Sequence, residues 1–64
     1  MNDLDKTYIY LKRMKPGEKI NILGLKRPID FIDVVKKLMR DHDEIRNTVE
    51  FNGDYTEMRK MTMF

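Results

Sequence analysis

The sequence predicts a small α+β domain with the element order helix, strand, helix, strand, strand. Three observations predict it: helical spacing of apolar residues in two segments, alternation near residue 20, and an Asn-Gly pair between alternating residues. We expect the strands to form one three-stranded antiparallel sheet. With 64 residues, the chain is expected to be a single domain, 1–64, with residues 62–64 as a candidate flexible tail.

The first predicted element is a helix over residues 3–14. Leu4, Tyr8 and Leu11 follow the i, i+4, i+7 spacing of one helix face. The segment TYIYL within it is rich in strand-forming residues, so a strand stays open there as the alternative. Pro16 ends the helix, because proline lacks an amide hydrogen and clashes with the preceding turn.

The second predicted element is a short strand over residues 18–22. Ile20 and Ile22 alternate with polar neighbours, which is typical of a half-buried strand. Only residues 23–27 then separate it from the next helix, which leaves room for one turn.

The second helix is predicted from Pro28 to about His42. Proline fits the first position of a helix, where a missing amide hydrogen costs nothing. The apolar residues cover a single arc of roughly 160°, and they are Phe31, Ile32, Val34, Val35, Leu38 and Met39. The acids Asp43 and Glu44 are expected in a solvated connection. No metal site is expected at His42, because neighbouring residues in a chain seldom point at one ion.

A hairpin is predicted around Asn52-Gly53. Asn-Gly is typical of a type I′ turn, in which both central residues have positive φ. A helix over residues 54–61, capped by its aspartate, is the competing interpretation.

Two hairpin registers are open. A two-residue loop places Phe51 opposite Asp54, and a four-residue loop places Phe51 opposite Thr56. Both registers put Val49, Phe51 and Met58 on one face of the sheet, which can therefore pack against the helices.

The order of these elements, with the phrase KPGEKINI before a helix, resembles the winged-helix (winged helix-turn-helix) DNA-binding fold over about residues 3–61. In that fold a short strand after the first helix pairs with a C-terminal hairpin, the wing. The resemblance implies that the helix from Pro28 is the recognition helix and that Asn52-Gly53 is the wing tip. The family's separate helix before the recognition helix is abbreviated or absent here.

Charge is distributed unevenly along the chain. Residues 12–27 carry a net +5 and residues 28–57 a net −4, although the whole chain is only +2. A concentrated basic segment attracts a polyanion even when the net charge is small. The alternative is a solvated surface with no partner.

DNA contacts are therefore expected mainly to phosphates, with strong salt dependence. The exposed face of the second helix combines three bases with three acids, which disfavours deep insertion into a groove. The candidate DNA-binding residues are Lys12, Arg13, Lys15, Lys19, Lys26, Arg27, Lys36, Lys37, Arg40 and Asn52, to which Arg59 and Lys60 are candidate additions.

The second functional hypothesis is a protein-interaction or self-assembly module without nucleic-acid binding. The partner, or a second copy in a homodimer, would meet the C-terminal tail MTMF or an unpaired strand edge. No catalytic motif is present, so neither an enzyme nor a cofactor is expected. The chain has no cysteine, no apolar run of membrane-spanning length and no secretory pattern in MNDLDK. We expect a cytoplasmic protein that does not enter a membrane.

Overall fold

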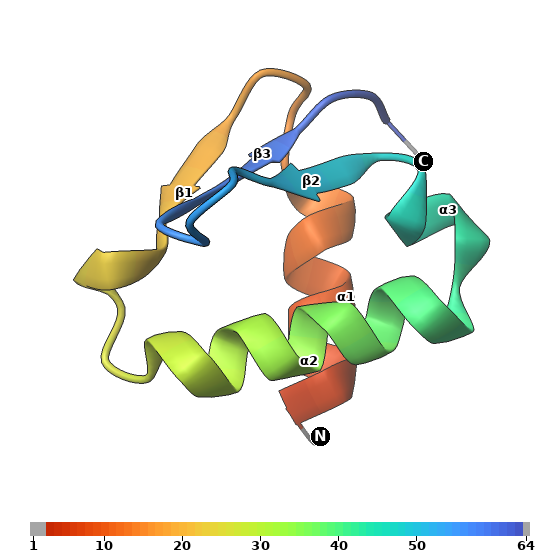
Figure 1. The fold of residues 1–64 in the computed structure, drawn as a ribbon. Coiled ribbons are helices and arrows are strands. Elements are labelled where there is room, and N and C mark those ends of the chain that lie inside the picture. The colour runs from red at the N-terminus through yellow and green to blue at the C-terminus, as the bar shows by residue number, and fades with distance from the viewer. Residues whose placement is uncertain (1–2, 64) are drawn as a thin grey trace.

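The computed structural model describes residues 3–63 and contains helices on one side of a small sheet (Figure 1). Its elements are α1 (Asp3–Arg13), β1 (Lys19–Asn21), the 3₁₀ turn η1 (Ile22–Gly24), α2 (Pro28–Asp41), α3 (Asp43–Arg46), β2 (Val49–Phe51) and β3 (Glu57–Lys60). The predicted α+β class is confirmed, and η1 occupies the link in which the sequence left room for one turn. The strand alternative within residues 7–11 is wrong, because that segment lies inside α1.

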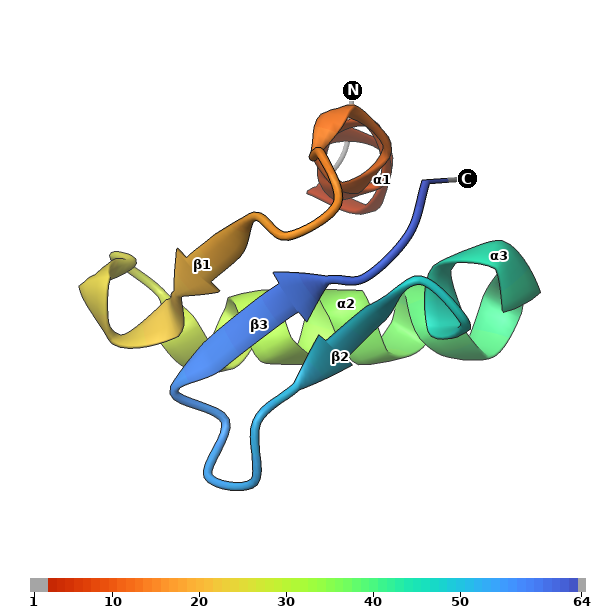
Figure 2. The ribbon, with the colours of Figure 1, turned by 90° about the horizontal axis from the view of Figure 1, so that it is seen from above.

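The three strands form an antiparallel sheet in the order β1-β3-β2. Met58 at the centre lies opposite Ile20 of β1 and opposite Phe51 of β2. Figure 2 shows β3 between the other two strands. The predicted sheet is confirmed, and the competing helix over residues 54–61 is wrong.

Both predicted hairpin registers are wrong. Phe51 pairs with Met58 and Val49 with Lys60, so the loop is longer than either prediction allowed. The Asn52 side chain stabilises the longer loop, because its Oδ1 accepts a hydrogen bond from the backbone amide of Glu57 at 2.9 Å. This bond extends the pairing beyond the end of β2 and moves the turn outward.

The turn also differs in its backbone. The Tyr55 amide donates to the Asn52 carbonyl at 3.2 Å, which closes a turn over residues 52–55. Among residues 3–63, positive φ occurs at Gly17 (91°) and Tyr55 (59°), and not at Asn52 or Gly53. A type I′ turn at Asn52-Gly53 is therefore excluded. The predicted sheet face is nevertheless confirmed, because Val49 and Met58 are buried and Phe51 is half-buried.

The core lies between the inner face of the sheet and the helices. Each of the longer helices and each strand supplies apolar side chains, and the buried set is Leu11, Met14, Ile20, Ile22, Val35, Leu38, Ile45, Val49 and Met58. In Figure 1, α2 runs beneath the sheet, and α1 crosses behind α2 at a steep angle. This arrangement leaves one side of α2 and the outer face of the sheet exposed.

The structure contradicts two of the sequence predictions, one for Lys60 and one for the segment that follows α2. Lys60 was a candidate DNA contact, but it is fully buried, and its Nζ donates to the backbone carbonyls of Leu11 at 2.6 Å and Lys12 at 3.1 Å. The expected solvated connection at Asp43 is instead the start of α3, which buries Ile45 completely.

Within residues 3–63, every helix falls short of the length and apolar character that a bilayer-spanning segment needs.

Candidate nucleic-acid interface

One exposed side of α2 carries all three cations of this helix. The residues on it recur at positions 29, 33, 36, 37 and 40, which helical geometry places on one side. They are Ile29, Asp33, Lys36, Lys37 and Arg40, and all are exposed. We call this side of α2, together with the hairpin loop 52–56, the helix–loop face.

A direct contact joins the two parts of the helix–loop face. The Nζ of Lys36 lies 4.5 Å from the centroid of the Tyr55 ring, within the range of a cation–π interaction. The Tyr55 ring also meets Phe51, with ring centroids 5.1 Å apart. The loop is thereby fixed beside α2, although sequence reasoning gave no role to Tyr55.

Two of the three α2 acids, Asp30 and Asp41, lie on the side of α2 toward α1, next to Lys37, and not on the side toward the hairpin loop. Asp30 lies 3.7 Å from Arg27 and lines a shallow hollow beside the start of α1. Asp41 lines a groove between α1 and α2. Three cations therefore share the helix–loop face with two carboxylates, Asp33 of α2 and Asp54 of the loop. The helix–loop face as defined thus keeps a net positive charge, which weakens the electrostatic objection that the sequence raised against α2.

Hydrogen bonds within the hairpin loop fix its shape. The Asn52 Nδ2 donates to the Thr56 hydroxyl at 2.7 Å, and that hydroxyl donates to the Asp54 carboxylate at 2.9 Å. With its Oδ1 bound to the Glu57 amide, the Asn52 side chain is used at both ends inside the loop. The Asn52 side chain therefore stabilises the loop through hydrogen bonds at both of its ends.

The ten predicted residues do not form one surface. Lys12 and Arg13 belong to the C-terminal end of α1, and Lys15 to the link after it. Figure 2 shows that this end of α1 and the hairpin loop lie far apart, with the strands between them in the view from above. Lys26 and Arg27, by contrast, directly precede α2 and are exposed.

Lys19 belongs to a third surface, the outer face of the sheet. It lines a small depression there with Asn52, Glu50, Glu57 and Arg59. The Arg59 Nη2 binds Glu50 Oε1 at 2.8 Å, so positive and negative charges balance on this face. Lys19 and Arg59 thus face a mixed surface, and not a continuous basic one.

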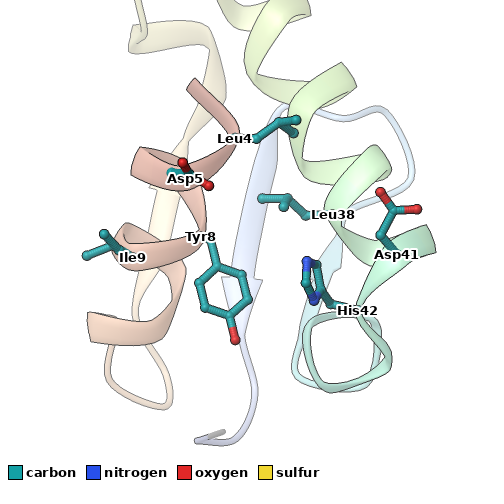
Figure 3. Close-up of a pocket in the computed structure, with 7 residues that line it drawn as sticks. All are labelled: Leu4, Asp5, Tyr8, Ile9, Leu38, Asp41 and His42. Atoms are coloured by element: carbon teal, nitrogen blue, oxygen red, sulfur yellow. The ribbon is translucent and has the colours of Figure 1, made fainter. Parts of the chain in front are cut away.

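The groove between α1 and α2 is the second notable surface feature (Figure 3). Its volume is about 480 Å³, and Tyr8 and His42 face each other across it with ring centroids 5.0 Å apart. Glu44 Oε1 accepts a hydrogen bond from the Tyr8 hydroxyl at 3.3 Å and lies 3.4 Å from His42 Nδ1. Sequence reasoning missed this arrangement, because its members are 36 positions apart.

The carboxylate at this end of the groove is held in its charged form. A hydrogen bond from its own backbone amide lowers the pKa of Glu44, and its contacts with Tyr8 and His42 lower it further against the opposing effect of desolvation. The pKa of Tyr8 is raised from its ordinary 10.0 by desolvation and then by the charge and hydrogen bond of Glu44. The groove therefore keeps a negative charge at one end.

Residues 3–63 contain no group of three or more histidine, cysteine, aspartate or glutamate side chains placed to hold a metal ion. The exposed side chains of Met61 and Met63 follow β3, while Phe64 of the predicted tail lies outside the described residues. Comparison with protein-family models, curated proteins and solved structures finds no match for this chain.

Proposed function

We propose that this protein is a small winged-helix-like DNA-binding protein that contacts duplex DNA through the helix–loop face. The observation that carries the proposal is the contact of Lys36 with Tyr55, which places a cationic helix side and a projecting hairpin loop in one surface. The strand order β1-β3-β2 supports the comparison, since the short strand after the first helix pairs with the C-terminal hairpin. By position, α2 corresponds to the recognition helix and loop 52–56 to the wing.

The size and charge of α2 suit this role. Its 14 residues span about 21 Å at the usual rise per residue, which is long enough to lie across a major groove about 12 Å wide. Lys36, Lys37 and Arg40 extend along its exposed side and can each meet a phosphate. Lys26 and Arg27 add positive charge at its N-terminal end. Because such contacts displace counterions, binding should weaken steeply with salt.

The segment before α2 is shorter than the corresponding segment of a full winged helix. Where a full winged helix has a separate helix, this chain has only η1. We therefore assign the contacts to α2 and the hairpin loop, and to phosphates more than to base edges. Affinity without strong sequence preference follows, because phosphate contacts position a protein but do not identify bases.

Two matched charge-reversal variants test the proposal. Lys36→Glu/Lys37→Glu/Arg40→Glu alters the helix–loop face, while Lys12→Glu/Arg13→Glu/Lys15→Glu makes the same charge change at the far end of α1. Binding to a labelled duplex would be followed by fluorescence anisotropy between about 50 and about 200 mM salt. We expect the α2 variant to lose nearly all affinity, with a salt slope reduced by about 1 for each phosphate contact removed.

The α1 variant should lose less, because only the loss of overall positive charge affects it. Absence of duplex binding by the unaltered protein at low salt would remove the proposal. A larger loss in the α1 variant would instead move the DNA contact to the basic segment around residues 12–15.

A further inference from the structure

We infer that the groove between α1 and α2 is a docking site for a segment of a partner protein that combines lysine or arginine with aliphatic side chains. The inference uses different residues from the DNA proposal and does not depend on it. It starts from the lining of the groove, which combines apolar walls with acidic rims (Figure 3).

The apolar part of the groove comes from both helices. Leu4 of α1 lies beside Leu38 of α2, while Ile9 lines the outer edge of the groove on α1 (Figure 3), and Leu4 and Ile9 are only partly buried. A groove of about 480 Å³ holds several side-chain groups. Its size falls within the range of ordinary ligand sites, roughly 300–1,000 Å³. An aliphatic side chain entering it would remove further apolar surface from water, which is the main favourable term in association.

The charged part of the groove selects the sign of the partner. Asp5 stands on the α1 side and Asp41 on the α2 side, and no lysine or arginine is among the described residues that line the groove. Glu44 adds a third carboxylate beside Tyr8 and His42. Complementary potentials across an interface favour a cationic partner and repel an anionic one. Phosphates are therefore poor occupants here.

The aromatic side chains fit the same partner. Tyr8 presents a half-buried ring at the groove, and a ring face attracts an ammonium or guanidinium group. Lysine and arginine also bury their aliphatic stems against apolar walls while their charged ends remain near water and carboxylates. A peptide segment satisfies the apolar, aromatic and acidic features together, whereas a small inorganic cation would leave the apolar walls uncovered.

The groove and the helix–loop face lie on different sides of α2. Leu38 and Asp41 face α1, while Lys36 faces the hairpin loop. A partner in the groove would therefore leave the helix–loop face open. The net charge of the whole chain is +2, so overall electrostatic attraction does not favour a cationic peptide. Binding of such a peptide would therefore indicate a local site.

The test uses two synthetic amphipathic peptides, one built from leucine and lysine and the other from leucine and glutamate in the same order. Each is added to the full-length isotope-labelled protein, and the backbone amide shifts are mapped by NMR. We expect the lysine peptide to shift amides in residues 4–9 and 38–44, and the glutamate peptide to leave them unchanged. Equal responses to both peptides, or shifts confined to other residues, would overturn the inference.

Matched variants sharpen the test. Asp5→Asn/Asp41→Asn removes the two rim charges, and we expect it to weaken lysine-peptide binding about three- to tenfold. Asp3→Asn/Asp33→Asn removes the same charge from the same two helices outside the groove, and it should bind as the unaltered protein does. Equal affinity of the two variants contradicts the inference. Concentration-dependent shifts of the groove amides without peptide would identify a second copy as the occupant and would also contradict it.

Discussion

Lys60 stabilises the C-terminal end of α1 from a position 49 residues after Leu11. The last carbonyl groups of a helix lack partners within the helix, so they need donors from elsewhere. The Lys60 ammonium group supplies hydrogen bonds to two of them, and this allows a cation to be buried in the core. Burial lowers the pKa of Lys60 from its ordinary 10.5, an effect that the charge of Glu18 partly opposes.

Replacement of Lys60 by alanine should destabilise the fold strongly. The variant loses both hydrogen bonds to α1 and leaves a cavity in place of the aliphatic stem. We expect a loss of about 2–4 kcal/mol in the free energy of unfolding. Urea denaturation would measure it as a lower midpoint.

Arg59→Ala is the matched control, because Arg59 is the adjacent strand residue and its pair with Glu50 is exposed. It should cost less than about 1 kcal/mol. Equal destabilisation by the two substitutions would show that Lys60 does not have the role assigned to it.

The local sequence could not reveal these residue roles. From sequence, a lysine in an alternating strand can either face solvent or donate hydrogen bonds to the end of a helix. Only the position of Lys60 beside the end of α1 in the fold decides between these two roles. Asn52 misled the turn prediction in a similar way. Its Oδ1 binds the Glu57 amide in place of a backbone carbonyl while its own amide donates to the Glu57 carbonyl, and this pairing beyond β2 stabilises the longer loop.

At the scale of elements, the clearest prediction from sequence was α2. Its apolar stripe extends over several turns, and Pro28 marks its first residue. By contrast, α3 has only four residues, too few to show a helical period, although it buries Ile45. A three-stranded antiparallel sheet was expected and is present, but the central position of β3 was not predicted, and both predicted hairpin registers were wrong.

Contacts of Glu44 connect α3 to α1 and should make stability depend on pH. The pKa of this carboxyl is below its ordinary 4.5 in the folded state, so the folded state binds the proton less readily than the unfolded chain. Its stabilising contribution is therefore present above pH 4.5 and is lost as the pH falls through the lowered pKa. We expect the stability difference between the unaltered protein and Glu44→Gln to shrink in that window.

Unfolding free energies measured from neutral pH down to about pH 3 would show this. Tyr8→Phe should retain most of the pH dependence, because the backbone amide of Glu44 is the largest cause of the lowered pKa. A difference between the unaltered protein and Glu44→Gln that stays constant with pH would contradict the assignment.

Across the whole molecule, charge is sorted by surface more than by sequence segment. The basic segment of residues 12–27 is divided among the end of α1, the outer face of the sheet and the start of α2. Of the three α2 cations, which sequence counting had balanced with three acids, Lys36 contacts the hairpin loop at Tyr55, and the acids of the helix–loop face are Asp33 and Asp54. Sequence totals could not show this, because the direction in which each helix residue points depends on where the helix packs.

We propose that duplex DNA binds the exposed side of α2 and the hairpin loop. Backbone amide shifts of the full-length protein, mapped by NMR during titration with a short DNA duplex, test it most directly. We expect the largest shifts at residues 29–40 and 52–56, with smaller changes at residues 12–19. Largest shifts at residues 12–19, with α2 and the loop unchanged, would contradict the claim.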